Sequence, residues 1–186
     1  MRVVSGTLRG RKLTPPQGDE RHIRPTSDRV KEALFDVIQF DVEGRDVLDL
    51  FAGTGQLGIE AASRGAKSVT LVDEYAGALR LIRENLERCG LADKSAIRVS
   101  QSDAIAFLRR PGKFDIILLD PPYMTGLIEK SLETIIGLDK LKFGGIIICE
   151  SIEPKGELDG FVSKIYKYGK TYLTKYTKIN EGDTEQ

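Results

Sequence analysis

The chain has 186 residues, of which 40% are hydrophobic and 30% charged, and its net charge at neutral pH is zero. This length and composition are typical of one compact globular domain spanning residues 1–186. The apolar runs are too short for a membrane span, and no apolar signal core opens the chain. The two cysteines lie in apolar surroundings, which suggests reduced thiols. One histidine cannot build a metal cluster. We therefore expect a cytoplasmic protein without a metal site.

Short apolar runs alternate with helical patterns along most of the chain. The runs lack strict alternation of apolar and polar residues, which is typical of strands buried on both faces of a parallel sheet. The helical segments carry apolar residues at three- and four-residue steps. In chain order we predict a small basic hairpin within 1–20, a helix at 27–38, a strand at 46–50, a helix at 57–64, a strand at 68–73, a helix at 75–89, and strands at 96–100, 114–120 and 144–150.

The C-terminal segment has a different pattern. Residues 161–179, "FVSKIYKYGKTYLTKYTKI", form two strand-like halves with Gly169 between them, which predicts an antiparallel hairpin at the sheet edge. Residues 180–186 are expected to form a flexible tail. Together, these elements predict an α/β fold with a doubly wound, mostly parallel, seven-stranded sheet.

Basic residues gather near both ends of the chain. Residues 1–31 carry eight Lys or Arg and three Asp or Glu, and residues 163–178 carry five Lys and no acid. Two basic segments flanking an acidic middle favour a polyanionic partner, although a charge run is also typical of an ordinary solvated surface. The predicted phosphate contacts at the N-terminal end are Arg2, Arg9, Arg11 and Lys12.

A glycine-rich turn, "DLFAGTGQLG", follows the first predicted strand. Gly53, Gly55 and Gly58 satisfy the G-x-G-x-x-G spacing, which allows a tight turn and close approach of a ligand, and which alone would suggest a dinucleotide. Asp73 ends the next strand twenty residues after Gly53, where a carboxylate can accept both hydroxyls of a ribose. The alternative for Asp73 is an acid that merely ends a strand or caps a helix.

Two further acids modify this interpretation. Asp49 lies inside the first strand, where it would repel a pyrophosphate but would suit the amino group and sulfonium of S-adenosylmethionine. Asp103 follows the third strand and could accept hydrogen bonds from an adenine amine, or could simply cap a helix. In a doubly wound sheet these strand ends converge on the carboxyl edge, where ligands bind.

The sequence "DPPY" (Asp120, Pro121, Pro122 and Tyr123) follows the fourth strand. The exocyclic amine of a nucleobase is a poor nucleophile, because its lone pair is delocalised into the ring. A carboxylate and a backbone carbonyl held rigidly by two prolines could accept both of its N–H groups, and a tyrosine could stack on the base. Alone, the sequence could equally be a strand-ending turn, but its place after a fourth strand favours base methylation.

These motifs resemble those of amino-methyltransferases, and the stretches "VVSGTLRGRKL", "IRPTSDRVKEALFDVI" and "YKYGKTYLTKY" resemble the RsmD family of 16S ribosomal RNA guanine-N2 methyltransferases. The resemblance covers nearly the whole chain. It implies a Rossmann-like class I methyltransferase, S-adenosylmethionine as the methyl donor, and a guanine (of the guanine-966 type) in assembling small subunits as the acceptor.

The resemblance also assigns site residues. It implies cofactor contacts at Asp49, Gly53, Gly55, Asp73 and Asp103, and a catalytic loop at Asp120, Pro121, Pro122 and Tyr123. The opening motif, which holds Arg24, Pro25, Thr26 and Arg29, would lie beside cofactor and substrate, and we predict that Arg24 and Arg29 contact RNA.

Two alternatives stay open on the residues alone. "DPPY" serves N6 of adenine as well as N2 of guanine, so another RNA or a DNA could be the acceptor, although a DNA enzyme would usually need a recognition domain that 186 residues do not accommodate. A non-catalytic module that binds S-adenosylmethionine is the second alternative, but such a module would not need the "DPPY" loop.

Overall fold

The computed structural model describes residues 1–17 and 26–179, which form a seven-stranded mixed sheet in the order β3-β2-β1-β4-β5-β7-β6. Strands β1 to β5 are parallel, whereas β7 runs antiparallel to both β5 and β6. The strands are β1 (Asp46–Asp49), β2 (Ser68–Asp73), β3 (Ile97–Gln101), β4 (Phe114–Leu119), β5 (Leu141–Ser151), β6 (Phe161–Tyr168) and β7 (Thr171–Lys178). The helices are α1 (Asp28–Val37), α2 (Gln56–Ser63), α3 (Ala76–Arg88), α4 (Ala104–Leu108) and α5 (Leu127–Gly137).

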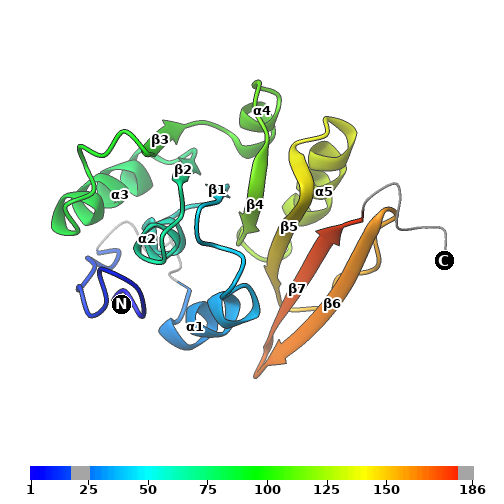
Figure 1. Cartoon of the computed structure of the whole chain (residues 1–186), viewed down its shortest axis with the longest axis horizontal. Coiled ribbons are helices and arrows are strands. Elements are labelled where there is room, and N and C mark those ends of the chain that lie inside the picture. The colour runs from blue at the N-terminus through cyan, green and yellow to red at the C-terminus, as the bar shows by residue number, and fades with distance from the viewer. Residues whose placement is uncertain (18–25, 180–186) are drawn as a thin grey trace.

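Successive residues of the central strands face two separate cores. On one face, Ile116 and Ile148 pack with apolar residues of α1, α2 and α3. On the other face, Ile117 and Ile147 pack with α4 and α5, which lie away from α1–α3 in the ribbon view (Figure 1). Because helices cover both faces, the central strands carry apolar residues on both faces. This arrangement confirms the predicted doubly wound α/β fold.

The strand order reverses at β1, and this reversal positions the functional site. The chain runs outward from β1 through β2 to β3, and then returns to β4 on the opposite side of β1. Loops that leave neighbouring strands in opposite directions open a crevice at the carboxyl edge of the sheet. Asp49 in β1 is in register with Leu118 in β4, so the glycine-rich turn lies beside the "DPPY" loop.

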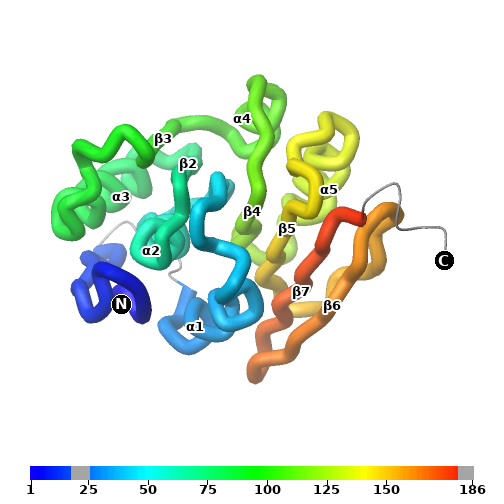
Figure 2. The backbone as a smooth tube through the Cα atoms, in the orientation of Figure 1, coloured from blue at the N-terminus to red at the C-terminus, as the bar shows by residue number. Residues whose placement is uncertain are grey.

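The predicted elements lie close to the observed ones, with three differences. The sequence analysis missed α4, which is too short to show a helical period, and α5, whose apolar Ile128, Leu132 and Ile135 do follow one. The predicted N-terminal hairpin contains only one isolated antiparallel bridge, between Arg2 and Lys12. The C-terminal hairpin is confirmed, and Figure 2 shows β6 and β7 side by side at the opposite end of the molecule from the N-terminal segment. Within the described ranges, no helix is long and apolar enough to cross a bilayer.

Buried polar side chains of α2 and α3 hold the N-terminal segment, residues 1–14. The carboxylate of Glu60 accepts hydrogen bonds from the backbone N–H groups of Val4 (2.8 Å) and Ser5 (2.9 Å). Further along, the side-chain oxygen of Asn85 accepts one from the N–H of Thr14 (2.7 Å). A segment that resembles a surface extension is therefore fastened to the body of the domain.

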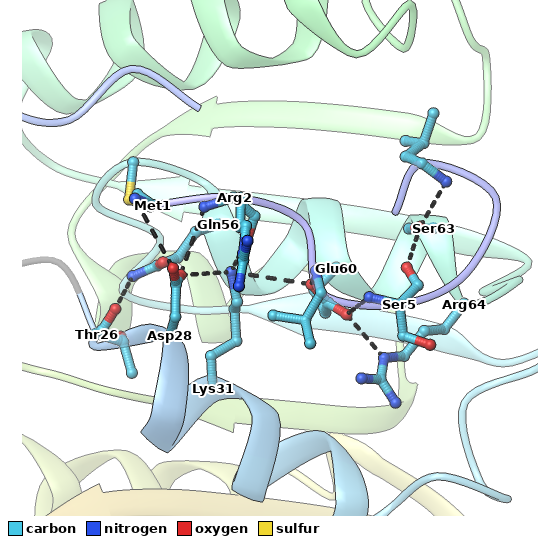
Figure 3. Close-up of polar contacts among 12 residues, drawn as sticks. Met1, Arg2, Ser5, Thr26, Asp28, Lys31, Gln56, Glu60, Ser63 and Arg64 are labelled. Atoms are coloured by element: carbon cyan, nitrogen blue, oxygen red, sulfur yellow. Dashed lines mark hydrogen bonds and ion pairs between the residues drawn. The ribbon is translucent and has the colours of Figure 1, made fainter. Parts of the chain in front are cut away.

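Charged side chains surround Glu60 on its other sides (Figure 3). Lys31 and Glu60 are both 0% exposed, and the Lys31 Nζ lies 3.9 Å from the nearest Glu60 oxygen. The Nε of Arg64 donates to Glu60 at 2.9 Å, and Lys31 also donates to the carbonyl of Arg2. A buried charge is costly unless it is paired, and Glu60 and Lys31 are each bound both by an opposite charge and by backbone groups of the N-terminal segment.

Candidate active site

A cavity of about 540 Å³ lies at the carboxyl edge of the sheet, over the crevice between β1 and β4. Its volume is in the range of pockets that bind small molecules. Most of the predicted cofactor and catalytic residues line this cavity, whereas Asp49 and Gly55 are not among its lining residues. The predicted residues that do line it are Gly53, Asp73, Asp103, Asp120, Pro121, Pro122 and Tyr123.

Asp73 organises the glycine-rich turn from the end of β2. One carboxylate oxygen accepts a hydrogen bond from the N–H of Gly53 (2.9 Å), and the other accepts one from the N–H of Tyr75 (3.0 Å). Gly53 has φ +54°, a left-handed conformation that favours glycine. Asp73 is therefore part of the architecture of the turn, and its carboxylate also faces the cavity.

Asp49 lies beneath the turn and is only 1% exposed. One of its oxygens accepts a hydrogen bond from the N–H of Gly58 (2.9 Å) at the start of α2. Among the described residues its other oxygen has no hydrogen-bond partner. Burial raises the pKa of Asp49 from 3.8 to about 7; the Gly58 bond opposes this shift, and the nearby carboxylates of Asp120 and Asp73 add to it. Asp49 thus stabilises the junction between the glycine-rich turn and α2 through its hydrogen bond with Gly58.

Two of the other predicted positions have clear local roles. Gly55 has φ +79°, and a β-carbon there would come within 3.2 Å of Leu71, so glycine at this position serves the packing of α2 on β2. Asp103 is the N-cap of α4, and its carboxylate accepts a hydrogen bond from the N–H of Ala106 (2.8 Å). The capping alternative for Asp103 is therefore correct, and the same side chain also lines the cavity.

Thr26 links the two loops of the site. Its hydroxyl donates a hydrogen bond to the carboxylate of Asp120, and its carbonyl accepts one from the side-chain nitrogen of Gln56 (2.8 Å). Gln56 is the first residue of α2, immediately after the glycine-rich turn. Figure 3 shows Thr26 and Gln56 facing each other beside the N-terminal segment. The segment before α1 thus connects the glycine-rich turn to the "DPPY" loop.

Glu150 is a site residue that the sequence analysis missed. It lies near the end of β5, is only 4% exposed and lines the cavity. Its Oε1 accepts a hydrogen bond from the hydroxyl of Tyr123 (3.0 Å). The signal was available, since an acid closes the apolar run "IIICE" just as Asp73 closes "SVTLVD". The bond to Tyr123 depends on strand register and was not visible in the sequence.

The predicted RNA contacts lie on the surface, as far as the structure describes them. Arg2, Arg9, Arg11, Lys12 and Arg29 are exposed, whereas Arg24 falls outside the described residues. Two basic residues lie next to cavity-lining positions in the chain: Arg29 lies between Ser27 and Val30, and the exposed Lys170 of the C-terminal hairpin precedes Thr171. Neither 1–17 nor 26–179 contains a cluster of His, Cys, Asp and Glu suited to a metal ion.

Comparison with known proteins agrees with this geometry. The family profile described as conserved hypothetical protein 95 matches residues 1–177. The chain is 35% identical to ribosomal RNA small subunit methyltransferase D of Haemophilus influenzae, over 83% of this chain and 80% of that protein. The protein of the same name from Escherichia coli is 36% identical, over 81% of this chain and 74% of its own length.

The fold comparison agrees with the sequence comparison. The solved structure of yhhF from Escherichia coli superposes with a TM-score of 0.83 at 31% identity, covering 96% of this chain and 97% of that one. A hypothetical protein of Thermus thermophilus superposes with a TM-score of 0.77 at 28% identity, covering 94% of this chain and 98% of that one. With its α/β sheet, its switch-point cavity and these relatives, the chain belongs to the conserved hypothetical protein 95 family, which is the RsmD family.

Proposed function

We propose that this protein transfers a methyl group from S-adenosylmethionine to the N2 amine of a guanine in 16S ribosomal RNA, of the guanine-966 type, during assembly of the small subunit in the cytoplasm. The observation that carries the proposal is that one cavity joins the glycine-rich turn to the "DPPY" loop. The relatives named ribosomal RNA small subunit methyltransferase D support ribosomal RNA as the substrate.

The residues around the turn suit S-adenosylmethionine. Asp73 lines the cavity with a carboxylate that can accept hydrogen bonds from a ribose, and Gly53 lets a ligand lie close to the backbone. Asp103 and Ala104, at the start of α4, lie where an adenine would be bound. Asp49 would act through the glycine-rich turn, where it binds the N–H of Gly58, and a cationic ligand nearby would stabilise its ionised form. When bound, the cofactor supplies a methyl group on a positively charged sulfur.

The "DPPY" loop would bind and orient the acceptor amine. The Asp120 carboxylate and the Pro121 carbonyl would each accept one N–H of the guanine N2 group, directing the nitrogen lone pair toward the methyl group. The nitrogen would gain an N–C bond as the S–C bond of the donor breaks, with the electron pair of that bond going to sulfur, and it would then lose one proton to solvent. Asp120 stabilises the positive charge that develops before this proton leaves, and the two prolines keep the acceptors in place, which is electrostatic preorganisation.

The test is methyl transfer onto small ribosomal subunits that lack the modification. Wild-type protein with labelled S-adenosylmethionine should modify a single guanine of 16S ribosomal RNA at N2, as mapped by nuclease digestion and mass spectrometry. Asp120→Ala should lower the single-turnover rate by about 10²–10³-fold. Its S-adenosylmethionine affinity should stay within a few-fold of wild type.

Each contrary outcome identifies a different function. Label on an adenine would identify an adenine-N6 enzyme, and cofactor binding without transfer to any nucleic acid would identify a binding module. Asp93→Ala, at an exposed acid in the loop between α3 and β3, is the matched control and should behave as wild type. Normal methylation by Asp120→Ala would remove Asp120 from the mechanism.

A further inference from the structure

Two carboxylates reach the cavity from neighbouring strands. Leu119 at the end of β4 is in register with Cys149 in β5, and the residues that follow them are Asp120 and Glu150. In-register residues on adjacent parallel strands project toward the same face, and the strands lie about 4.8 Å apart. Asp120 and Glu150 both line the cavity.

A pair of carboxylates distinguishes guanine from adenine. An ionised carboxylate accepts hydrogen bonds and donates none. The Watson–Crick edge of guanine carries two neighbouring donor groups, N1–H and N2–H₂. The same edge of adenine places its amine beside N1, whose lone pair is an acceptor. A second carboxylate beside the amine site therefore stabilises guanine and repels adenine.

We propose that Glu150 is a specificity-determining residue that accepts the N1–H of the target guanine while Asp120 holds its N2 amine. This inference rests on the proposed function and names the group that selects the base. The Tyr123 hydroxyl donates a hydrogen bond to Oε1 of the Glu150 carboxylate (3.0 Å). The two oxygens of a carboxylate can together accept about four hydrogen bonds, so a contact with Tyr123 is compatible with a bond from a base N–H.

The burial of Glu150 makes the selection strong. With only 4% of its surface exposed, the side chain has little water to satisfy it when a base presents an acceptor instead of a donor. A site built to accept a particular N–H rejects an analogue that lacks it, because a buried polar group then loses its partner. The lone pairs of the Glu150 carboxylate and of an acceptor at N1 would also repel each other, which further increases the preference for guanine.

The decisive substrate is 2-aminopurine, which keeps the N2 amine but has an acceptor at N1. Small-subunit RNA would be ligated with either guanine or 2-aminopurine at the mapped target position and assembled into particles. Wild-type protein should prefer guanine in kcat/KM by about 10²-fold or more. In Glu150→Gln, the amide can donate to N1 of 2-aminopurine, so the preference should fall by about 10- to 100-fold.

Tyr123→Phe is the matched control. It removes the hydroxyl that contacts Glu150 but keeps the carboxylate, so its rate should fall while its preference for guanine stays close to wild type. Equilibrium binding, followed by 2-aminopurine fluorescence, should show Glu150→Gln binding the 2-aminopurine particle more tightly than wild type does.

The outcomes separate this inference from the proposed function. If wild-type protein does not methylate guanine, the proposed function fails. If wild-type protein methylates guanine but Glu150→Gln leaves the preference unchanged, only the role of Glu150 is wrong. An equal drop in preference in Tyr123→Phe would mean that the preference depends on the contact between Tyr123 and Glu150 and not on acceptance of N1–H by the carboxylate, which would also overturn the inference.

Discussion

The hydroxyl of Thr26 donates a hydrogen bond to the carboxylate of Asp120, across 94 positions of the chain. Thr26 is 9% exposed, and its carbonyl is held in turn by Gln56 at the start of α2. Thr26 is therefore held by Gln56 through its carbonyl, and its hydroxyl restricts where the Asp120 carboxylate can lie. We expect Thr26 to act as a positioning residue for the catalytic loop.

Thr26→Val should lower the single-turnover methylation rate by about tenfold or more, because the isosteric side chain keeps the packing but lacks the donor. Thr26→Ser, which keeps the hydroxyl, should restore the rate to within a few-fold of wild type. In an Asp120→Ala background, Thr26→Val should add no further loss, which a double-mutant cycle measures. Additive losses would show that Thr26 acts elsewhere.

Asp73→Ala should weaken S-adenosylmethionine binding by about 10- to 100-fold, because a charge-assisted hydrogen bond to the ribose is lost. The same change removes the acceptor for the N–H groups of Gly53 and Tyr75, so the melting temperature should fall as well. Calorimetry and thermal melts, with exposed Asp93→Ala as the control, would measure both effects. Wild-type affinity in a folded Asp73→Ala protein would refute the ribose contact.

Asp49 should make the protein less stable as pH rises. Its pKa is raised to about 7 in the folded protein, so the folded state binds a proton that the unfolded state releases near pH 4. The stabilising contribution of protonated Asp49 is complete below about pH 4 and is lost as pH rises through about 7. Asp49→Asn should remove this part of the slope in denaturant titrations at pH 4 to 8. An identical slope in the two proteins would show that Asp49 is ionised throughout.

The N-terminal basic residues should contribute to the salt dependence of RNA binding. Reversing the charge of Arg9, Arg11 and Lys12 should flatten the plot of log affinity against log salt by about 0.7–0.9 per lost phosphate contact. Because backbone groups dock this segment, the variant should keep its fold and its cofactor affinity.

The matched control reverses three exposed basic residues on the side of α4 and α5, namely Arg109, Lys113 and Lys130. It makes the same change in net charge away from the N-terminal segment. If both variants flatten the slope equally, the effect is due to net charge and the segment makes no specific contact.

The doubly wound fold and the edge of the sheet that carries the site could be predicted, because both follow from apolar runs and from the residues that end them. Strands buried on two faces carry apolar residues on both, so β1, β2 and β4 were evident, and the acids and glycines in or after them marked the carboxyl edge. The helix α4 was missed, since five residues cannot show a 3.6-residue period.

The sequence pattern could not predict hydrogen bonds between polar groups that lie far apart in the chain. Glu60 and Asn85 occupy helix positions that a polarity pattern assigns to solvent, yet both are 0% exposed because they bind backbone groups of the N-terminal segment. The Tyr123–Glu150 bond likewise depends on how β4 and β5 align. The periodicity of apolar residues predicts which face of an element is buried. It does not predict which polar groups form hydrogen bonds with each other in the folded protein.

The docking of the N-terminal segment has a consequence for the order of folding. The backbone donors of Val4 and Ser5 are satisfied by Glu60, and that of Thr14 by Asn85, which is 71 positions later. During synthesis these first residues emerge before their acceptors exist, and contacts over such separations form slowly. A nascent chain stopped before α3 is complete lacks Asn85, so it cannot satisfy the N–H of Thr14 and complete the docking of the segment. The part of the protein made first is thus among the last to become protected against hydrogen exchange.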